Sequence, residues 1–167
     1  PVLLRVLALG LALAMASRAS TPAHAQGRAE PASISSWEVM ANPGLVLPDA
    51  EGAATLAADG ADLWLATETQ VARYQKGRWL RPTSPEDVSR IFALAPTGGG
   101  ALWAFGFEGG AWQLDRGGRW WRRDPGSIAD LYDAAAAGPD DVWAVGYDYE
   151  EAIGTLLHWD GAGFQIQ

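Results

Sequence analysis

The sequence contains no cysteine among its 167 residues. Disulfides, cysteine-ligated zinc, a thiol nucleophile and a lipidated N-terminal cysteine are therefore excluded for this stretch of chain. Positive charge is also scarce: 12 Lys and Arg stand against 20 Asp and Glu, which gives a formal net charge of −8. An acidic surface repels phosphate backbones, so we expect no nucleic-acid partner.

Several sequence motifs that carry chemistry are missing as well. There is no Gly-x-Ser-x-Gly elbow for a serine nucleophile, and the glycines at 98–100 lack the lysine of a phosphate-binding loop. His158 has no second His or Cys nearby, which favours a strand histidine over a metal ligand. The acid pairs Glu86-Asp87 and Asp140-Asp141 are typical of turns and solvated loops. We therefore predict no catalytic residue, no metal site and no cofactor.

The beginning of the sequence has the features of an export signal. Arg5 precedes an apolar run at residues 6–16, and Ala23-His24-Ala25 fits the small-x-small cleavage pattern. We predict a signal peptide at 1–25 and a flexible lead-in at 26–35, hence a secreted or periplasmic protein with no membrane span in the mature chain. The alternative is an uncleaved anchor helix, but the apolar run is shorter than the roughly 20 residues of a span.

Aromatic residues recur along the rest of the chain. Nine residues are tryptophan. A first series consists of Trp64, Trp103 and Trp143, at spacings of 39 and 40 residues, and they stand in the segments DLWLAT, ALWAFG and DVWAVG. A second series consists of Trp37, Trp79, Trp120 and Phe164. Each unit of about 40 residues holds four short β-prone runs separated by turn residues, which is typical of the blades of a β-propeller.

The repeat predicts an all-β fold, a β-propeller segment within residues 36–167. We expect three four-stranded blades at about 53–81, 89–123 and 128–166, preceded by one N-terminal outer strand at 36–40. Three blades are fewer than the roughly four of a closed propeller, so we expect an incomplete propeller and a piece of a longer protein. Its open blade edges are expected to pair with missing blades or with another copy.

The repeat resembles the tryptophan-rich bacterial secreted propellers, whose blades carry segments such as D-V-W-A-V-G and H-W-D-G. It is similar, more loosely, to tectonin-type lectin propellers and to the periplasmic propellers of two-component regulators. It departs from WD-repeat blades, because no Gly-His pair precedes Trp159-Asp160, and from sialidases, because the aspartate box is absent. The resemblance implies a fold, whereas propellers of one sequence type bind unrelated partners.

We predict from these features a secreted, non-enzymatic binding or scaffold module whose ligand is a carbohydrate or a peptide or protein. Two alternatives stay open: a periplasmic sensory ectodomain of a two-component-type receptor, and a fragment of a propeller enzyme such as a hydrolase or lyase. An enzyme would need carboxylates or metal ligands from further blades.

The loops indicate where a ligand would bind. With the strands of a blade labelled a to d from the axis outward, the a–b and c–d turns on one rim are short and rich in Gly and Asp. The b–c and d–a loops on the other rim are longer and carry aromatic and acidic side chains. The candidate ligand-binding residues are Phe107, Glu108, Tyr147 and Tyr149. Their acidic surroundings favour a neutral or cationic ligand.

Tryptophans at matching blade positions are expected to be wedges between neighbouring sheets, with Trp143 almost fully buried. Trp112 and Trp121 fall outside both series. Either a buried or an exposed position is open for each of them.

The predicted leader can be tested by expressing the chain in a Gram-negative host and sequencing the N-terminus of the protein from the envelope fraction. Because Ala23-His24-Ala25 is the cleavage pattern, we expect Gln26 as the new first residue. A protein from this fraction that still begins at residue 1 or 2 would show that the leader is not cleaved.

Overall fold

The computed structural model describes residues 55–81 and 83–167. The predicted signal peptide, the lead-in and the outer strand at 36–40 lie outside these residues. The described part belongs to one compact unit of the chain, Met40–Gln167. Within that part, no helix is both long enough and apolar enough to cross a membrane.

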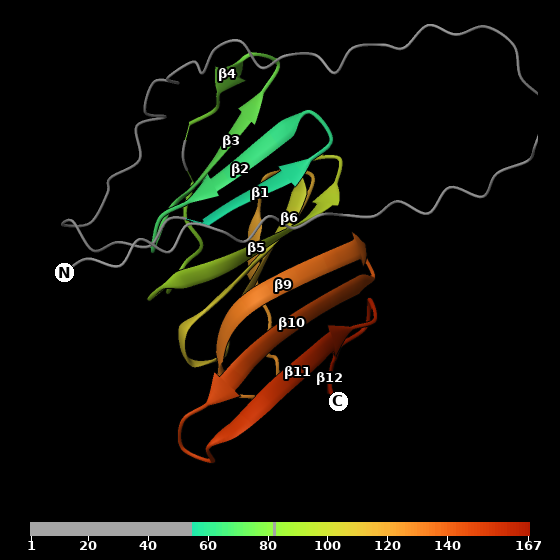
Figure 1. Ribbon diagram of the computed structural model, residues 1–167. Helices are drawn as coiled ribbons and strands as arrows, with labels where there is room; N and C mark the ends of the chain where they lie inside the picture. Colours follow the sequence, from blue (N-terminus) through green and yellow to red (C-terminus); the bar gives the residue numbers. More distant parts are fainter. Residues whose placement is uncertain (1–54, 82) are drawn as a thin grey trace, which may run out of the picture. The chain divides into compact units, whose positions relative to one another are not determined.

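Three four-stranded antiparallel sheets make up the described fold, and each follows chain order (Figure 1). Blade 1 consists of β1 (Thr55–Asp59), β2 (Asp62–Ala66), β3 (Val71–Gln75) and β4 (Arg78–Trp79). Blade 2 consists of β5 (Ile91–Gly98), β6 (Ala101–Gly106), β7 (Gly110–Leu114) and β8 (Trp120–Arg122). Blade 3 consists of β9 (Asp130–Gly138), β10 (Asp141–Asp148), β11 (Ile153–Trp159) and β12 (Phe164–Ile166). The prediction of an all-β propeller segment with three four-stranded blades is confirmed.

Short turns join the strands on the a–b and c–d side. Lys76 and Gly77 link β3 to β4 with φ values of 51° and 81°, the left-handed pair that a two-residue hairpin turn requires. The central strand β6 is buried along nearly its whole length, which explains why ALWAFG is apolar without alternation.

Each blade has two faces, because successive side chains of a strand point to opposite sides of the sheet. We call the face that carries the first-series tryptophan of the second strand the Trp face. The opposite face carries the residues on either side of that tryptophan, and we call it the receiving face. The flanking residues are Leu63 and Leu65 in blade 1, Leu102 and Ala104 in blade 2, and Val142 and Ala144 in blade 3.

The core is formed where the Trp face of one blade packs on the receiving face of the next. Trp64 and Ala66 of blade 1 share one buried cluster with Leu102 and Ala104 of blade 2. In a second cluster Trp103 and Phe105 pack with Val142, Ala144 and Leu157 of blade 3. The Trp103 ring also lies 4.9 Å from that of Trp159 and 5.3 Å from that of Phe164, measured between ring centroids. Trp64 and Trp103 are therefore wedges between sheets.

Trp143 does not follow this rule, and the prediction of its near-complete burial is wrong. Its side chain is 37% exposed because it lies on the Trp face of blade 3, which no described blade covers. The indole N–H donates to Asp141 Oδ1 at 2.8 Å, and the ring stacks on His158 at 4.0 Å. Trp112 and Trp121, whose burial the sequence left open, differ: Trp112 is buried and Trp121 is exposed.

The wedge role predicts a large stability difference between Trp103→Ala and a turn substitution, Lys76→Ala. Trp103 is fully buried, so its truncation should lower the free energy of unfolding by about 3–5 kcal/mol. Lys76 is exposed, and its substitution should change that free energy by no more than about 0.5 kcal/mol. Urea unfolding followed by circular dichroism measures both values. Similar midpoints for the two variants would contradict the blade assignment.

Candidate functional site

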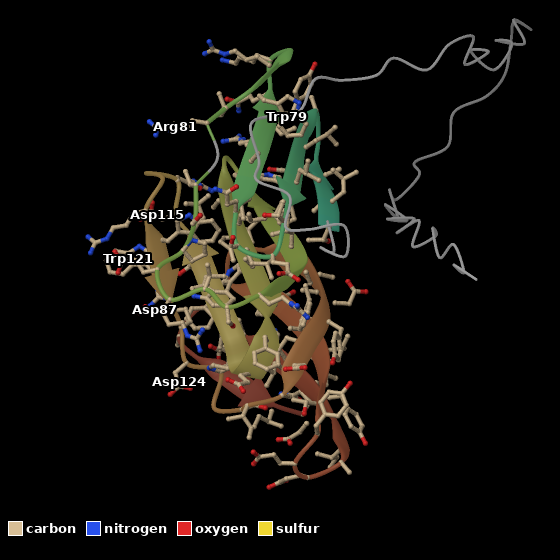
Figure 2. The ribbon with its side chains drawn as sticks, turned by 90° about the vertical axis from the view of Figure 1, so that its left-hand side faces the viewer. Trp79, Arg81, Asp87, Asp115, Trp121 and Asp124 are labelled. Atoms are coloured by element: carbon tan, nitrogen blue, oxygen red, sulfur yellow. The ribbon has the colours of Figure 1, made fainter. Side chains whose placement is uncertain are left out.

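A hollow opens on the side of the blades where the b–c and d–a connections lie, the side that faces the reader in Figure 2. Its volume is about 390 Å³, and residues from blades 2 and 3 line it. The lining consists of Phe107, Glu108, Ile128, Asp130, Asp148, Tyr149 and Glu150. We call this hollow the rim pocket.

One wall of the rim pocket is the short 3-10 turn η1 (Phe107–Gly109), which joins β6 to β7. Glu108 has a φ of 48°, and its backbone N–H donates to Asp130 Oδ1 at 2.9 Å. Gly109 has a φ of 66°, and a Cβ there would lie 2.0 Å from the Ser127 carbonyl oxygen. Only glycine fits this close approach, which holds the turn against the loop that leads into blade 3.

Hydrogen bonds of Asp130 connect that wall to the tyrosines of blade 3. The Tyr132 hydroxyl donates to Asp130 Oδ2 at 3.1 Å, and the hydroxyls of Tyr132 and Tyr149 are hydrogen-bonded at 3.0 Å. The Tyr132 ring also contacts Phe92 of blade 2, with 5.1 Å between ring centroids. Tyr149 is 68% exposed, so one of the most exposed aromatic rings of the described residues is held in place by its hydroxyl.

The same contacts change the acidity of Tyr132. Its hydrogen bond with Tyr149, followed by desolvation and the hydrogen bond to Asp130, raises the pKa of Tyr132 above the ordinary value of 10.0. The neutral phenol is favoured because its one O–H donates a hydrogen bond, which a phenolate could not do, and because a phenolate would face the negative Asp130. The Tyr132 hydroxyl therefore stays protonated as a link between Asp130 and Tyr149.

The opposite wall is formed by the end of β10 and the turn after it. Asp148 is almost buried, and its Oδ1 accepts hydrogen bonds from the backbone N–H groups of Glu150 and Glu151 at 2.9 and 3.0 Å. These bonds hold the turn that presents Tyr149 and Glu150. Gly146 lets β10 lie close to the start of β9, since a Cβ there would be 2.1 Å from the Asp130 carbonyl oxygen.

The charge of the rim pocket is negative. Four of its lining residues are carboxylates, and none is Lys, Arg or His. Among the described residues, no three His, Cys, Asp or Glu side chains lie close enough to hold a metal ion together. A second hollow of about 580 Å³ adjoins the rim pocket and shares Ile128, Asp148 and Glu150 with it. An extended ligand could therefore contact both.

The structure places the four ligand-binding candidates of the sequence differently. Phe107, Glu108 and Tyr149 line the rim pocket together. Tyr147 does not line it, and it lies in strand β10 and not in the loop where it was predicted. Its ring supports that of Tyr149 edge to face at 5.0 Å. Tyr147 is thus a neighbour of the site.

The sequence candidates did not include four of the lining residues, Ile128, Asp130, Asp148 and Glu150, nor Tyr132 behind them. The signal for two of them was the segment Asp130-Leu131-Tyr132, where polar side chains flank a buried leucine at the start of a strand. Alternation places Asp130 and Tyr132 on the same side of that strand. Their position beside η1 depends on how blade 3 packs on blade 2, which the local sequence does not reveal.

Trp121 is a second exposed aromatic side chain that a ligand could contact. Figure 2 shows it beside Asp115 at the outer side of blade 2, and its indole N–H donates to Asp115 Oδ2 at 3.0 Å. This bond, with the backbone N–H of Arg119, lowers the pKa of Asp115. The Arg119 guanidinium lies over the Trp121 ring at 3.9 Å. One ring face is therefore already occupied, and the rim pocket is the better candidate.

No family model and no curated protein matches the sequence. Among solved structures, the chain is similar to the propeller YCF48 bound to D1 peptide, with 19% identity and a TM-score of 0.53, over 65% of this chain and 37% of that one. It is also similar to a fucose lectin from Kordia zhangzhouensis in complex with methyl-fucoside, with 14% identity and a TM-score of 0.42, over 69% and 97% of the two chains. The likeness to YCF48 shows the propeller fold, and this chain spans little more than a third of that protein's length.

The tyrosine contacts predict a measurable change in titration. In Tyr149→Phe the hydrogen bond that contributes most to the raised pKa of Tyr132 is lost, so that pKa should fall towards its ordinary value of 10.0. The Cζ chemical shift of Tyr132, followed by NMR across alkaline pH, measures it. Tyr147→Phe is the control, because Tyr147 touches Tyr149 only through its ring. An unchanged Tyr132 titration in Tyr149→Phe would show that the two hydroxyls are not bonded in solution.

Proposed function

We propose that the chain is an exported, non-enzymatic binding module of β-propeller type whose ligand occupies the rim pocket. The observation that carries this proposal is the exposed Tyr149 ring, held in place by Tyr132 beside four carboxylates and without a basic residue. A ring that is exposed and yet restrained loses little conformational freedom when a ligand covers it.

The chemistry of the pocket favours a cationic group. Lysine ammonium and arginine guanidinium groups bind over aromatic faces and pair with carboxylates. Tyr149 and Phe107 supply the rings, and Glu108 and Glu150 supply charge at the same opening. The proposed ligand is therefore a peptide or protein segment that presents a lysine or arginine side chain. The adjoining hollow has room for the residues next to that side chain.

Carbohydrate is the second candidate. The exposed face of Tyr149 is suited to stack on a sugar ring, and carboxylates of the pocket can accept hydrogen bonds from its hydroxyls. A neutral sugar gains nothing from the concentration of four negative charges, whereas a cation does. This difference makes the cationic peptide the first proposal.

A sensory ectodomain would use the same pocket to detect its ligand, so this alternative shares the binding site and adds a signalling step after binding. The non-enzymatic role is part of the proposal. It is supported by Asp130 and Asp148, two pocket carboxylates whose oxygens accept hydrogen bonds from backbone N–H groups and so shape the walls.

The proposal is tested by screening the full chain against peptide and glycan arrays and measuring the affinity of the strongest hits by calorimetry. Tyr149→Ala and Glu108→Gln should each lower the affinity for a lysine- or arginine-containing peptide about tenfold. This is the effect of losing about 1.4 kcal/mol of cation–π or charge attraction. Affinity should also fall as salt rises, because the attraction is between charges.

Asp140→Asn is the matched control, since it removes one exposed carboxylate on the opposite side of blade 3. It should leave binding unchanged. Binding that survives both pocket variants and is lost in Asp140→Asn would show that the site lies on the a–b and c–d rim, and would contradict the proposal. Hits confined to neutral glycans would show that the ligand is a carbohydrate and not a peptide.

A further inference from the structure

The packing rule of the blades leaves two faces without a described partner. Blade 1 covers blade 2 and blade 2 covers blade 3, each time with a Trp face on a receiving face. The Trp face of blade 3 and the receiving face of blade 1 remain, at the two ends of the described series of blades (Figure 1).

The free Trp face of blade 3 is apolar at its centre. Trp143 is 37% exposed and Val145 is 45% exposed, and Leu156 lies opposite Val145 on the neighbouring strand. At the same register positions of blade 2, Trp103 and Phe105 are fully buried against blade 3. These three side chains therefore form an apolar patch that no described residue covers.

Trp143 is also held in position before any partner arrives. Asp141 Oδ1 accepts the indole N–H at 2.8 Å and lies 2.9 Å from His158 Nε2, while the imidazole stacks on the indole. Tryptophans fixed in this way are frequent anchors of protein interfaces, because little side-chain freedom remains to be lost on binding.

The receiving face of blade 1 carries apolar residues at the positions where the receiving face of blade 2 contacts Trp64. The strand registers of the two blades show which positions are equivalent. In this order, Leu56, Ala58, Leu63 and Leu65 of blade 1 correspond to Leu94, Pro96, Leu102 and Ala104 of blade 2. Leu56 is 63% exposed, whereas its counterpart Leu94 is buried under blade 1. One molecule therefore carries both halves of an interface that it already forms twice within itself.

We propose that the Trp face of blade 3 docks on the receiving face of blade 1 of a second copy of this chain. The second copy is the occupant that the observations favour, because its first blade has the same receiving pattern as the two faces that Trp64 and Trp103 occupy. Two copies joined head to tail at both ends bring together six described blades, and closed propellers typically have about 4–8. Docking and ligand binding use different surfaces, so this inference does not depend on the proposed ligand.

The test measures the mass of the full chain in solution by light scattering, for the wild type, Trp143→Glu and Leu56→Glu. The wild type should have twice the mass of one chain. Either variant places a carboxylate in one half of the interface. It should therefore raise the dissociation constant of the dimer at least about 30-fold. Ala162→Glu, in an exposed turn between β11 and β12, is the control and should remain dimeric.

Mixing the two variants separates this arrangement from other dimers. The Leu56→Glu chain keeps an intact Trp face and the Trp143→Glu chain keeps an intact receiving face, so an equimolar mixture should again form dimers through one interface. Circular dichroism confirms that each variant is folded, and Trp143→Ala provides a milder change at the same position. A monomeric wild type, a dimer that neither variant weakens, or a mixture that stays monomeric would overturn the proposal.

Discussion

The fold depends on one repeated contact, the packing of a tryptophan of one blade against the receiving face of the next. A four-stranded blade cannot bury both of its faces alone, so each blade relies on its neighbours for its core. The contact joins both aromatic series of the sequence, since Trp103 of blade 2 meets Phe164 of blade 3. The same contact brings η1 of blade 2 beside β9 of blade 3, and the rim pocket lies at this junction.

The architecture could be predicted from the sequence because tryptophan recurs at the same position of each blade, about every 40 residues. Trp64, Trp103 and Trp143 mark the same strand three times, and Gly and Asp mark the turns between strands. The burial of an individual position was harder to predict. Trp143 has a local sequence similar to those of the other two, but burial depends on the neighbouring blade, and no described blade covers it. Trp112 is buried because it lies opposite Ala104 on the receiving face.

The candidate site was predicted in part, and the missing part has a physical reason. Phe107, Glu108 and Tyr149 could be found because they come directly after strand ends, where a loop exposes its side chains. Asp130 and Tyr132 lie within a strand and come to the pocket through contacts with blade 2 that are remote in sequence. Tyr147 was assigned to a loop because Gly146 resembles a strand end, yet β10 continues to Asp148. A glycine can serve close approach as well as a turn.

The contact between blades is tested most directly by a double-mutant cycle on Trp103 and Phe164, which belong to different blades and lie 5.3 Å apart between ring centroids. The free energies of unfolding of Trp103→Leu, Phe164→Leu and the double variant give their coupling. An edge-to-face aromatic pair should contribute about 0.5–1.5 kcal/mol beyond the area that it buries. Effects that add to within about 0.3 kcal/mol would mean that the two rings are not in contact, and would contradict the packing of blade 2 on blade 3.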